Sequence, residues 1–122
     1  MQIVDANIVL RYLLNDTEDL AEEAAKILEN KKVYVPTEVI AEIVYVLEKV
    51  YQAKNDEIAD SLRELFNYGN IDVDDSRVVE EALSVYSSRK LDFVDTLLFA
   101  YKKVRNDEVY TFDKKLKKLL NE

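Results

Sequence analysis

The sequence predicts a single α/β domain over residues 1–122, with a short central parallel sheet flanked by helices on both faces. Three observations lead to this fold class. Brief apolar runs typical of buried strands alternate along the chain with longer segments whose apolar residues recur at helical spacing. A chain of 122 residues can bury one core, and a single glycine and a single proline leave little room for linkers.

Four short runs predict strands, and polar or turn-forming residues bound them. Three are mainly apolar, and the third in order alternates apolar with acidic residues, as an edge strand does. Because long helical segments separate these runs, we expect the strands to be parallel. The runs are residues 2–4, 33–35, 71–73 and 109–112.

The longer segments predict helices. A helix over about 17–30 has Asp16 or Thr17 as its cap, and a helix over 37–52 starts directly after the proline. Gly69 sits where a left-handed C-terminal cap would end the helix that begins behind Asn55. The other helices are expected around 79–86, over about 92–105 and over 113–120.

The composition excludes several kinds of site. Without histidine or cysteine there is no serine–histidine or cysteine–histidine triad, no zinc site of the usual ligands and no disulfide. Catalysis would have to use carboxylates, hydroxyls, lysines or a hard metal ion. A formal net charge of −8 argues against non-specific coating of nucleic acid.

Membrane and export signals are missing from the sequence. The N-terminus has no basic region followed by an apolar stretch, and no uncharged run approaches the roughly 18 residues needed to cross a bilayer. We therefore expect a cytoplasmic protein that does not associate with membranes.

Asp5 and Asp113 follow the first and last predicted strands, where the ligand crevice of an open parallel sheet lies. The alternative is that each caps the helix that begins at the next residue.

Glu42 and Asp95 are carboxylates within apolar helices, where an ionised group needs partners. Glu42 could instead lie on a solvent-facing edge with Glu38 and Tyr45. Asp95 could instead form a reciprocal cap with Asp92.

Taken together, the four carboxylates predict a metal centre. A core cannot hold several like charges close together unless a cation lies between them. Mg²⁺ or Mn²⁺ takes oxygen ligands, and two such ions can activate water and stabilise the leaving oxygen of a phosphodiester without any histidine.

Four motifs in this order resemble those of the PIN-domain ribonucleases, and most closely the short VapC-type toxins of prokaryotic toxin–antitoxin pairs. The resemblance covers essentially the whole chain. The motifs are Asp5-Ala6-Asn7 with the apolar run after it, Glu42 in its apolar helix, Asp92-Phe93-Val94-Asp95-Thr96, and Thr111-Phe112-Asp113-Lys114-Lys115.

The resemblance implies a PIN-like fold and a metal-dependent endoribonuclease that acts on single-stranded or structured RNA and leaves 5′-phosphate and 3′-hydroxyl ends. It implies that Mg²⁺ or Mn²⁺ is held by Asp5, Glu42, Asp95 and Asp113. Asn7 and Thr111 would hold carboxylates or the attacking water, and Asp92 would be auxiliary. It also implies a homodimer and a cognate antitoxin protein that covers the acidic pocket.

The sequence departs from the family pattern at its end. Family members commonly continue past the last helix into another short strand, whereas this sequence stops at Glu122. We therefore expect the sheet to be one strand short, with residues 109–112 on an edge that a partner could cover.

The charge is distributed unevenly. Residues 101–122 carry a net charge of +3, and the other 100 residues carry −11. Lys114 and Lys115, with Arg11 and Lys90 extending the path, could guide an RNA backbone to the metal. The alternative is that the lysines simply solvate an amphipathic terminal helix.

Three other functions fit the same residues. The chain could be an RNA-processing nuclease without a toxin role. It could be a non-catalytic PIN-like interaction module whose acidic pocket receives an arginine-bearing peptide. A phosphoacceptor receiver domain also groups aspartates at strand ends, but it needs a lysine directly after a later strand.

Overall fold

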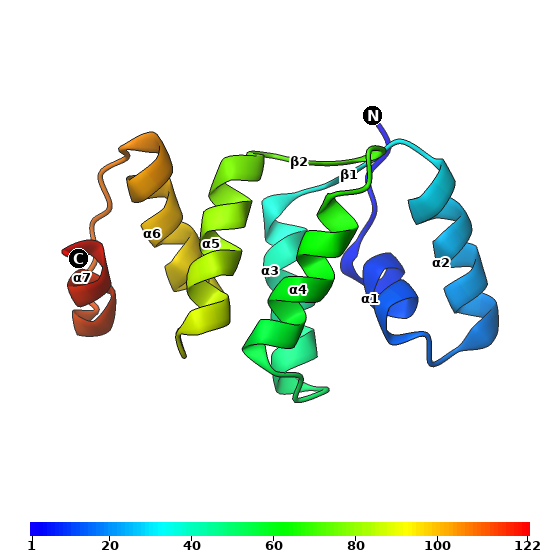
Figure 1. The fold of residues 1–122 in the computed structure, drawn as a ribbon, viewed down its shortest axis with the longest axis horizontal. Coiled ribbons are helices and arrows are strands. Elements are labelled where there is room, and N and C mark those ends of the chain that lie inside the picture. Colours follow the sequence, from blue (N-terminus) through cyan, green and yellow to red (C-terminus); the bar gives the residue numbers. More distant parts are fainter.

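Apolar side chains at helical spacing fold into seven helices that lie in a row beside a small sheet (Figure 1). The computed structural model describes all residues of the chain, 1–122. Helices α1 and α7 lie towards opposite ends of its long axis, with α3, α4, α5 and α6 between them. The elements are α1 (Ala6–Leu14), α2 (Glu18–Asn30), β1 (Val33–Val35), α3 (Thr37–Lys49), α4 (Asn55–Phe66), β2 (Ile71–Val73), α5 (Ser76–Ser88), α6 (Phe93–Arg105) and α7 (Lys114–Leu120).

The sheet consists of β1 and β2, which pair in parallel with Val33 opposite Ile71. Helices flank this sheet, as the sequence predicts. The first predicted strand, residues 2–4, makes only an isolated parallel bridge, in which Tyr34 N–H donates to the Gln2 carbonyl at 2.8 Å and Val4 N–H donates to the Tyr34 carbonyl at 3.3 Å. The segment therefore extends the sheet by one short contact.

The strand predicted over residues 109–112 is wrong. The segment Glu108–Phe112 has no regular structure, and none of its backbone N–H groups makes a hydrogen bond. The side chains of Tyr110 and Phe112 are 87% and 98% exposed. The reason lies in the packing of α7, whose apolar side chains hold this end of the chain on α5 and α6, away from the edge of the sheet.

The predicted role of Gly69 is also wrong. Helix α4 ends at Phe66, its C-terminal cap is Asn67, and no glycine has a positive φ. The left-handed conformation occurs instead at Asn15 and Asn106, which end α1 and α6, and at Gln52, which lies beyond the end of α3 at Lys49, so that this helix does not reach residue 52 as predicted. Asparagine adopts this conformation more readily than other residues with side chains.

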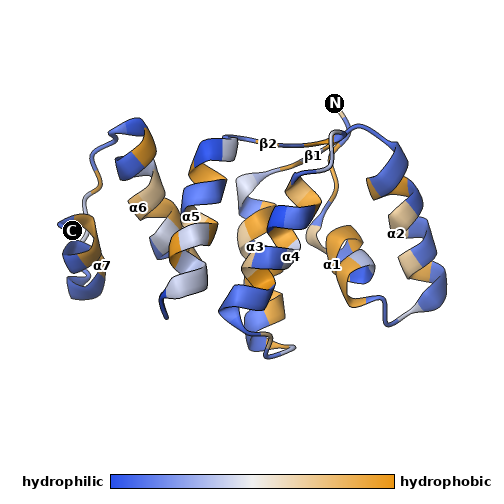
Figure 2. Ribbon diagram, viewed as in Figure 1, coloured by the Kyte–Doolittle hydropathy of each residue, from blue (hydrophilic) through white to orange (hydrophobic).

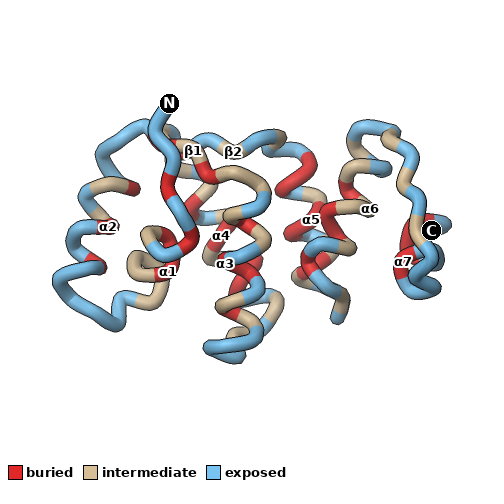
Figure 3. Tube along the Cα trace, turned by 180° about the vertical axis from the view of Figure 1, so that it is seen from behind, coloured by how far each residue is buried: buried red, intermediate tan, exposed pale blue.

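The core lies along the middle of the row. One cluster of buried apolar residues joins the sheet to α1, α3, α4, α5 and α6, and a small separate cluster fixes α7 (Figure 3). Helices α1 and α3 are largely hydrophobic, whereas α2 is largely hydrophilic and mostly exposed (Figure 2). The α7 cluster contains Leu116, Leu119 and Leu120, packed against Val85, Leu91, Leu98, Phe99 and Val109.

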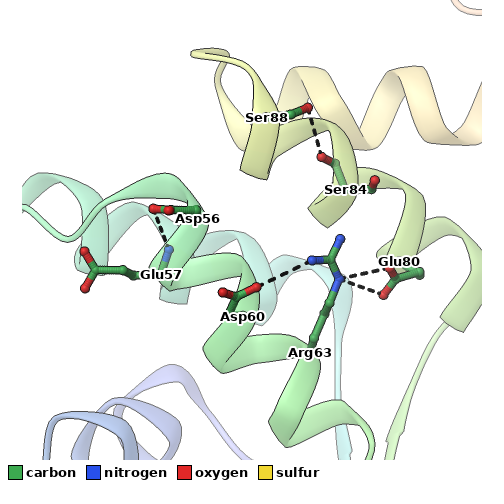
Figure 4. A network of polar contacts seen from close by, with 7 residues as sticks. All are labelled: Asp56, Glu57, Asp60, Arg63, Glu80, Ser84 and Ser88. Atoms are coloured by element: carbon green, nitrogen blue, oxygen red, sulfur yellow. Dashed lines mark hydrogen bonds and ion pairs between the residues drawn. The ribbon is translucent and has the colours of Figure 1, made fainter.

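Polar contacts fix the helices relative to one another. Arg63 on α4 binds Glu80 on α5, with Nε 2.9 Å from Oε1, and also contacts Asp60 at 3.7 Å (Figure 4). Asp74, directly after β2, accepts hydrogen bonds from the N–H and hydroxyl of Thr37 and from the hydroxyl of Tyr34. The N-terminus of α3 is therefore capped from the end of β2 rather than from its own flank.

No helix of the structure is both long enough and apolar enough to serve as a membrane span.

Candidate functional site

Asp5 occupies the N-cap position of α1. Its backbone is extended, and its Oδ1 atom accepts a hydrogen bond from the Ile8 N–H at 3.2 Å. The side chain is exposed and lines a pocket between the N-terminal segment and α2, together with Asn7. Asp5 therefore performs the capping role that the sequence offered as its alternative.

Asp113 caps α7 in the same way. Its Oδ1 atom accepts a hydrogen bond from the Leu116 N–H at 2.9 Å, and its own N–H donates to the Thr111 hydroxyl at 3.0 Å. Thr111 thus contacts the backbone of Asp113 rather than its carboxylate.

Asp95 lies in the first turn of α6 and is half-buried. Burial raises the pKa of its carboxyl group, and the negative charges of Asp92 and Asp113 raise it further. Asp92 occupies the N-cap position, but its side chain makes no capping hydrogen bond, so the reciprocal cap suggested by the sequence does not form. The structure therefore brings Asp92, Asp95 and Asp113 into electrostatic contact.

These three aspartates line one cavity, which we call the interhelical cleft. The cleft has a volume of about 810 Å³ and lies among the C-terminal ends of α3 and α5 and the starts of α4, α6 and α7. Glu48 and Asp56 contribute two further carboxylates, neither of which the sequence singled out as a site residue. The sequence feature that could have pointed to Glu48 is Tyr86, which lies within the apolar stripe of α5, because a buried phenol hydroxyl needs a hydrogen-bond partner.

Glu42 lies in the middle of α3 and is exposed, as are Glu38 and Tyr45. This is the solvent-facing edge that the sequence offered as its alternative. The buried face of the same helix consists of Ile40, Ile43, Val44 and Leu47.

The four predicted metal ligands do not meet in this structure. No group of three or more Asp and Glu side chains lies close enough together to hold a metal ion. Asp5 begins α1 and Asp113 begins α7, and these helices lie far apart along the row (Figure 1). As arranged here, the residues do not fit a bound metal ion.

The predicted RNA contacts differ in their surroundings. The Arg11 guanidinium donates to Asp16 at 2.9 Å and to the Tyr51 hydroxyl at 3.3 Å, and its Nε atom is buried without a partner. Lys114 and Lys115 are exposed and make no ion pair, and Lys115 lines the interhelical cleft. Unlike Arg11, these two lysines are free to contact a phosphate.

Comparison with protein families gives a match to the PIN domain over residues 3–120, which is nearly the whole chain. The chain belongs to the PIN domain family. This PIN domain is 32% identical over 124 residues to a protein of Aquifex aeolicus (strain VF5) described as VapC ribonuclease, and the match covers 98% of this chain and 92% of the relative. No solved structure matches the chain. PIN-domain nucleases generally depend on divalent metal ions.

Proposed function

We propose that this protein is a metal-dependent endoribonuclease, a hydrolase that cuts phosphodiester bonds in single-stranded or structured RNA and leaves 5′-phosphate and 3′-hydroxyl ends. The observation that carries the proposal is the likeness along almost the entire chain to the PIN domain and to a relative described as a ribonuclease. The absence of histidine agrees with chemistry that relies on carboxylates and a hard metal ion.

The proposal assigns Mg²⁺ or Mn²⁺ to Asp5, Glu42, Asp95 and Asp113, with Asn7, Asp92 and Thr111 in supporting roles. The electrostatics of Asp95 support this assignment, because a carboxyl group whose pKa is raised by burial and by neighbouring carboxylates is stabilised in its ionised form by a cation. Asp5 and Glu42 lie apart from the interhelical cleft, so the proposed centre has to assemble from separate parts of this fold.

The decisive experiment measures cleavage of labelled RNA with Mg²⁺, with Mn²⁺ and with a chelator, followed by analysis of the end groups. We expect Asp5→Asn and Glu42→Gln to lower the cleavage rate at least about 100-fold. Glu38→Gln is the matched control, because Glu38 is an exposed carboxylate one turn from Glu42. Cleavage that persists in the chelator, or unchanged in Asp5→Asn, would overturn the proposal.

We further propose that the protein is a cytoplasmic toxin, that it forms a homodimer, and that a cognate antitoxin protein binds it. The relative described as VapC supports this, as do the uncovered aromatic side chains of Tyr110 and Phe112. Expression should arrest growth unless the neighbouring gene is expressed as well. Normal growth during expression of an active nuclease would favour an RNA-processing role.

A further inference from the structure

Residues 2–4, which extend the sheet beside β1, are paired along one side only. Their hydrogen bonds to Tyr34 use the Gln2 carbonyl and the Val4 N–H, whereas the N–H and carbonyl groups of Ile3, between them, make no hydrogen bond. Successive residues of a strand direct these groups to opposite sides, so those of Ile3 face away from β1. A pocket of about 570 Å³ borders the same residues. We call this unpaired side the N-terminal edge.

The chain also carries a backbone segment that lacks a partner, the irregular segment Glu108–Phe112. None of its N–H groups makes a hydrogen bond, and the side chains of Tyr110 and Phe112 project almost fully into solvent. Val109 and the leucines of α7 pack together and hold the segment at the opposite end of the row from α1 (Figure 1). The irregular segment and the N-terminal edge therefore do not meet within one chain.

Each of these two unpaired stretches leads directly into a carboxylate of the proposed metal centre. Asp5 follows the N-terminal edge, and Asp113 follows the irregular segment. Parallel pairing of the two stretches would place both carboxylates at the same side of the sheet, because the carboxyl ends of parallel strands lie together. Asp95 would come with Asp113, since the two are in electrostatic contact. Such pairing would supply the group of three carboxylates that a single chain does not form.

The charges of the two ends are complementary between copies of the chain. Helix α7 carries four lysines and no acidic residue, a charge of +4. Helix α2 carries five acidic residues and one lysine, and five minus one gives −4. Helix α2 lies beside the N-terminal edge, because its Ile27 lines the same pocket as residues 2–5. Contact of α7 with α2 of another copy is attractive, whereas contact between two α7 helices is repulsive.

We propose that two copies of this chain form a dimer in which the irregular segment of each pairs in parallel with the N-terminal edge of the other. Asp113 of the partner subunit then lies beside Asp5, and each metal centre takes residues from both chains. Two-fold symmetry makes the contact twice and covers the aromatic side chains of both irregular segments. The inference rests on the proposed ribonuclease function and homodimer, and it adds that neither copy alone holds a complete site.

Disulfide cross-linking tests the pairing without any reference to activity. The register that sets Asp113 beside Asp5 also sets Tyr110 beside Gln2, and neighbouring strands lie about 4.8 Å apart, within the range that a disulfide spans. The chain has no cysteine of its own. We expect the double variant Gln2→Cys, Tyr110→Cys to oxidise to a covalent dimer of twice the 14.2 kDa chain mass.

The two single variants, refolded together with a size tag on one of them, should give the mixed covalent dimer. The matched control combines Gln2→Cys with Ser84→Cys, an exposed position on α5, and should give none. A double variant that closes its disulfide within a monomer would overturn the inference. So would wild-type protein that stays monomeric at every concentration in analytical ultracentrifugation. Both results would leave the nuclease proposal standing.

Mixing two inactive variants tests whether the site is shared. When Asp5→Asn and Asp113→Asn are refolded together from urea, half of the dimers contain one chain of each, and one of the two sites in such a dimer holds both aspartates. We therefore expect mixing to restore about a quarter of the wild-type cleavage rate. The matched control mixes Asp95→Asn with Asp113→Asn. It should restore nothing, because both aspartates of a site come from the same chain.

The outcomes separate the inference from the function on which it rests. A cross-linked dimer whose inactive variants do not complement each other would mean that each site belongs to one chain, and would overturn the two-chain site. Wild-type protein that forms the expected cross-link but never cuts RNA with Mg²⁺ or Mn²⁺ would refute the nuclease proposal and retain the exchange of segments. Circular dichroism verifies that each variant is folded.

Discussion

The Tyr86 hydroxyl on α5 donates a hydrogen bond of 2.5 Å to Oε2 of Glu48 on α3. The same ring is completely buried and packs edge-on against Phe93, the first residue of α6, with the ring centroids 5.7 Å apart. Burial and the neighbouring carboxylates raise the pKa of the Tyr86 hydroxyl, so it stays protonated and remains a donor. One side chain thus joins three helices, and its partner Glu48 lines the interhelical cleft.

Tyr86→Phe should lower the free energy of unfolding by about 1–2 kcal/mol, because it removes a hydrogen bond to a charged acceptor and leaves Glu48 only partly hydrated. Urea unfolding with an unchanged denaturant slope would show this. Tyr110→Phe is the control, since its hydroxyl bonds Glu108 on the exposed surface. Equal effects of the two substitutions would mean that the Glu48 contact contributes nothing.

Two substitutions at Asp5 separate its role as a helix cap from its proposed role in RNA cleavage. Asparagine caps helices as well as aspartate does, so Asp5→Asn should leave the free energy of unfolding within about 0.5 kcal/mol of the wild type, whereas Asp5→Ala should lower it by about 1 kcal/mol. Both variants should lose RNA cleavage. The measurements are thermal unfolding and a cleavage assay on the same samples. A stable and fully active Asp5→Asn protein would leave Asp5 with capping alone.

Asp95 should make the metal-free protein less stable as the pH rises. Its pKa is higher in the folded than in the unfolded chain, so folding disfavours the ionised form, and stability is lost as the pH passes upward through the raised pKa. Asp95→Asn removes this loss. In a chelator, its melting temperature should therefore exceed that of the wild type at pH 7, and the difference should shrink towards pH 4. A lower melting temperature for the variant at pH 7 would contradict the argument.

Gly69→Ala should stabilise the protein by about 0.4–1 kcal/mol. Gly69 does not have a positive φ, and a Cβ atom there would meet nothing within 4 Å, so alanine loses less entropy on folding without strain. Asn106→Ala supplies the contrast, because Asn106 ends α6 with a φ of 60° and alanine is strained there. Chemical denaturation of both variants measures the two changes in the free energy of unfolding. A destabilised Gly69→Ala protein would mean that Gly69 does cap the helix in a left-handed conformation, as the sequence predicted.

Local signals predicted six of the seven helices, although no range was predicted for α1 and α3 ends three residues before its predicted end. Helical spacing placed α2 and α6 within about a residue of their observed ends, because an amphipathic stripe is a property of the segment itself. The strand predicted over residues 109–112 depended instead on a distant partner. Its mainly apolar run is present, but the edge of the sheet lies elsewhere in the fold, and no local pattern reveals that.

Some parts of the candidate site likewise follow from local sequence, and others depend on how distant helices pack. Asp92 and Asp95 lie within one turn of the same helix, which the sequence predicts. The carboxylate of Asp113 comes close to them only because α7 packs on α6. The positions of Asp5 and Glu42 relative to these aspartates depend on how whole helices are arranged, which residue spacing does not specify. Glu48 near the end of α3 and Lys54 just before α4 also line the cleft. The hydrogen bonds of Asn55 hold the start of α4 against the end of α5 there, and no sequence motif indicates this contact.

The irregular segment Glu108–Phe112 is also where we expect a protease to cut the protein first. An extended stretch with unpaired amides fits a protease active site, and chymotrypsin prefers the aromatic residues that Tyr110 and Phe112 present. A cut after Phe112 would leave residues 113–122 attached only through non-covalent contacts: the small leucine cluster, the hydrogen bond from Lys102 to the Leu120 carbonyl and the ion pair between Arg89 and Glu122. Limited digestion should therefore detach Asp113, Lys114 and Lys115 first, and a bound antitoxin that covers the segment would appear as resistance at that single bond.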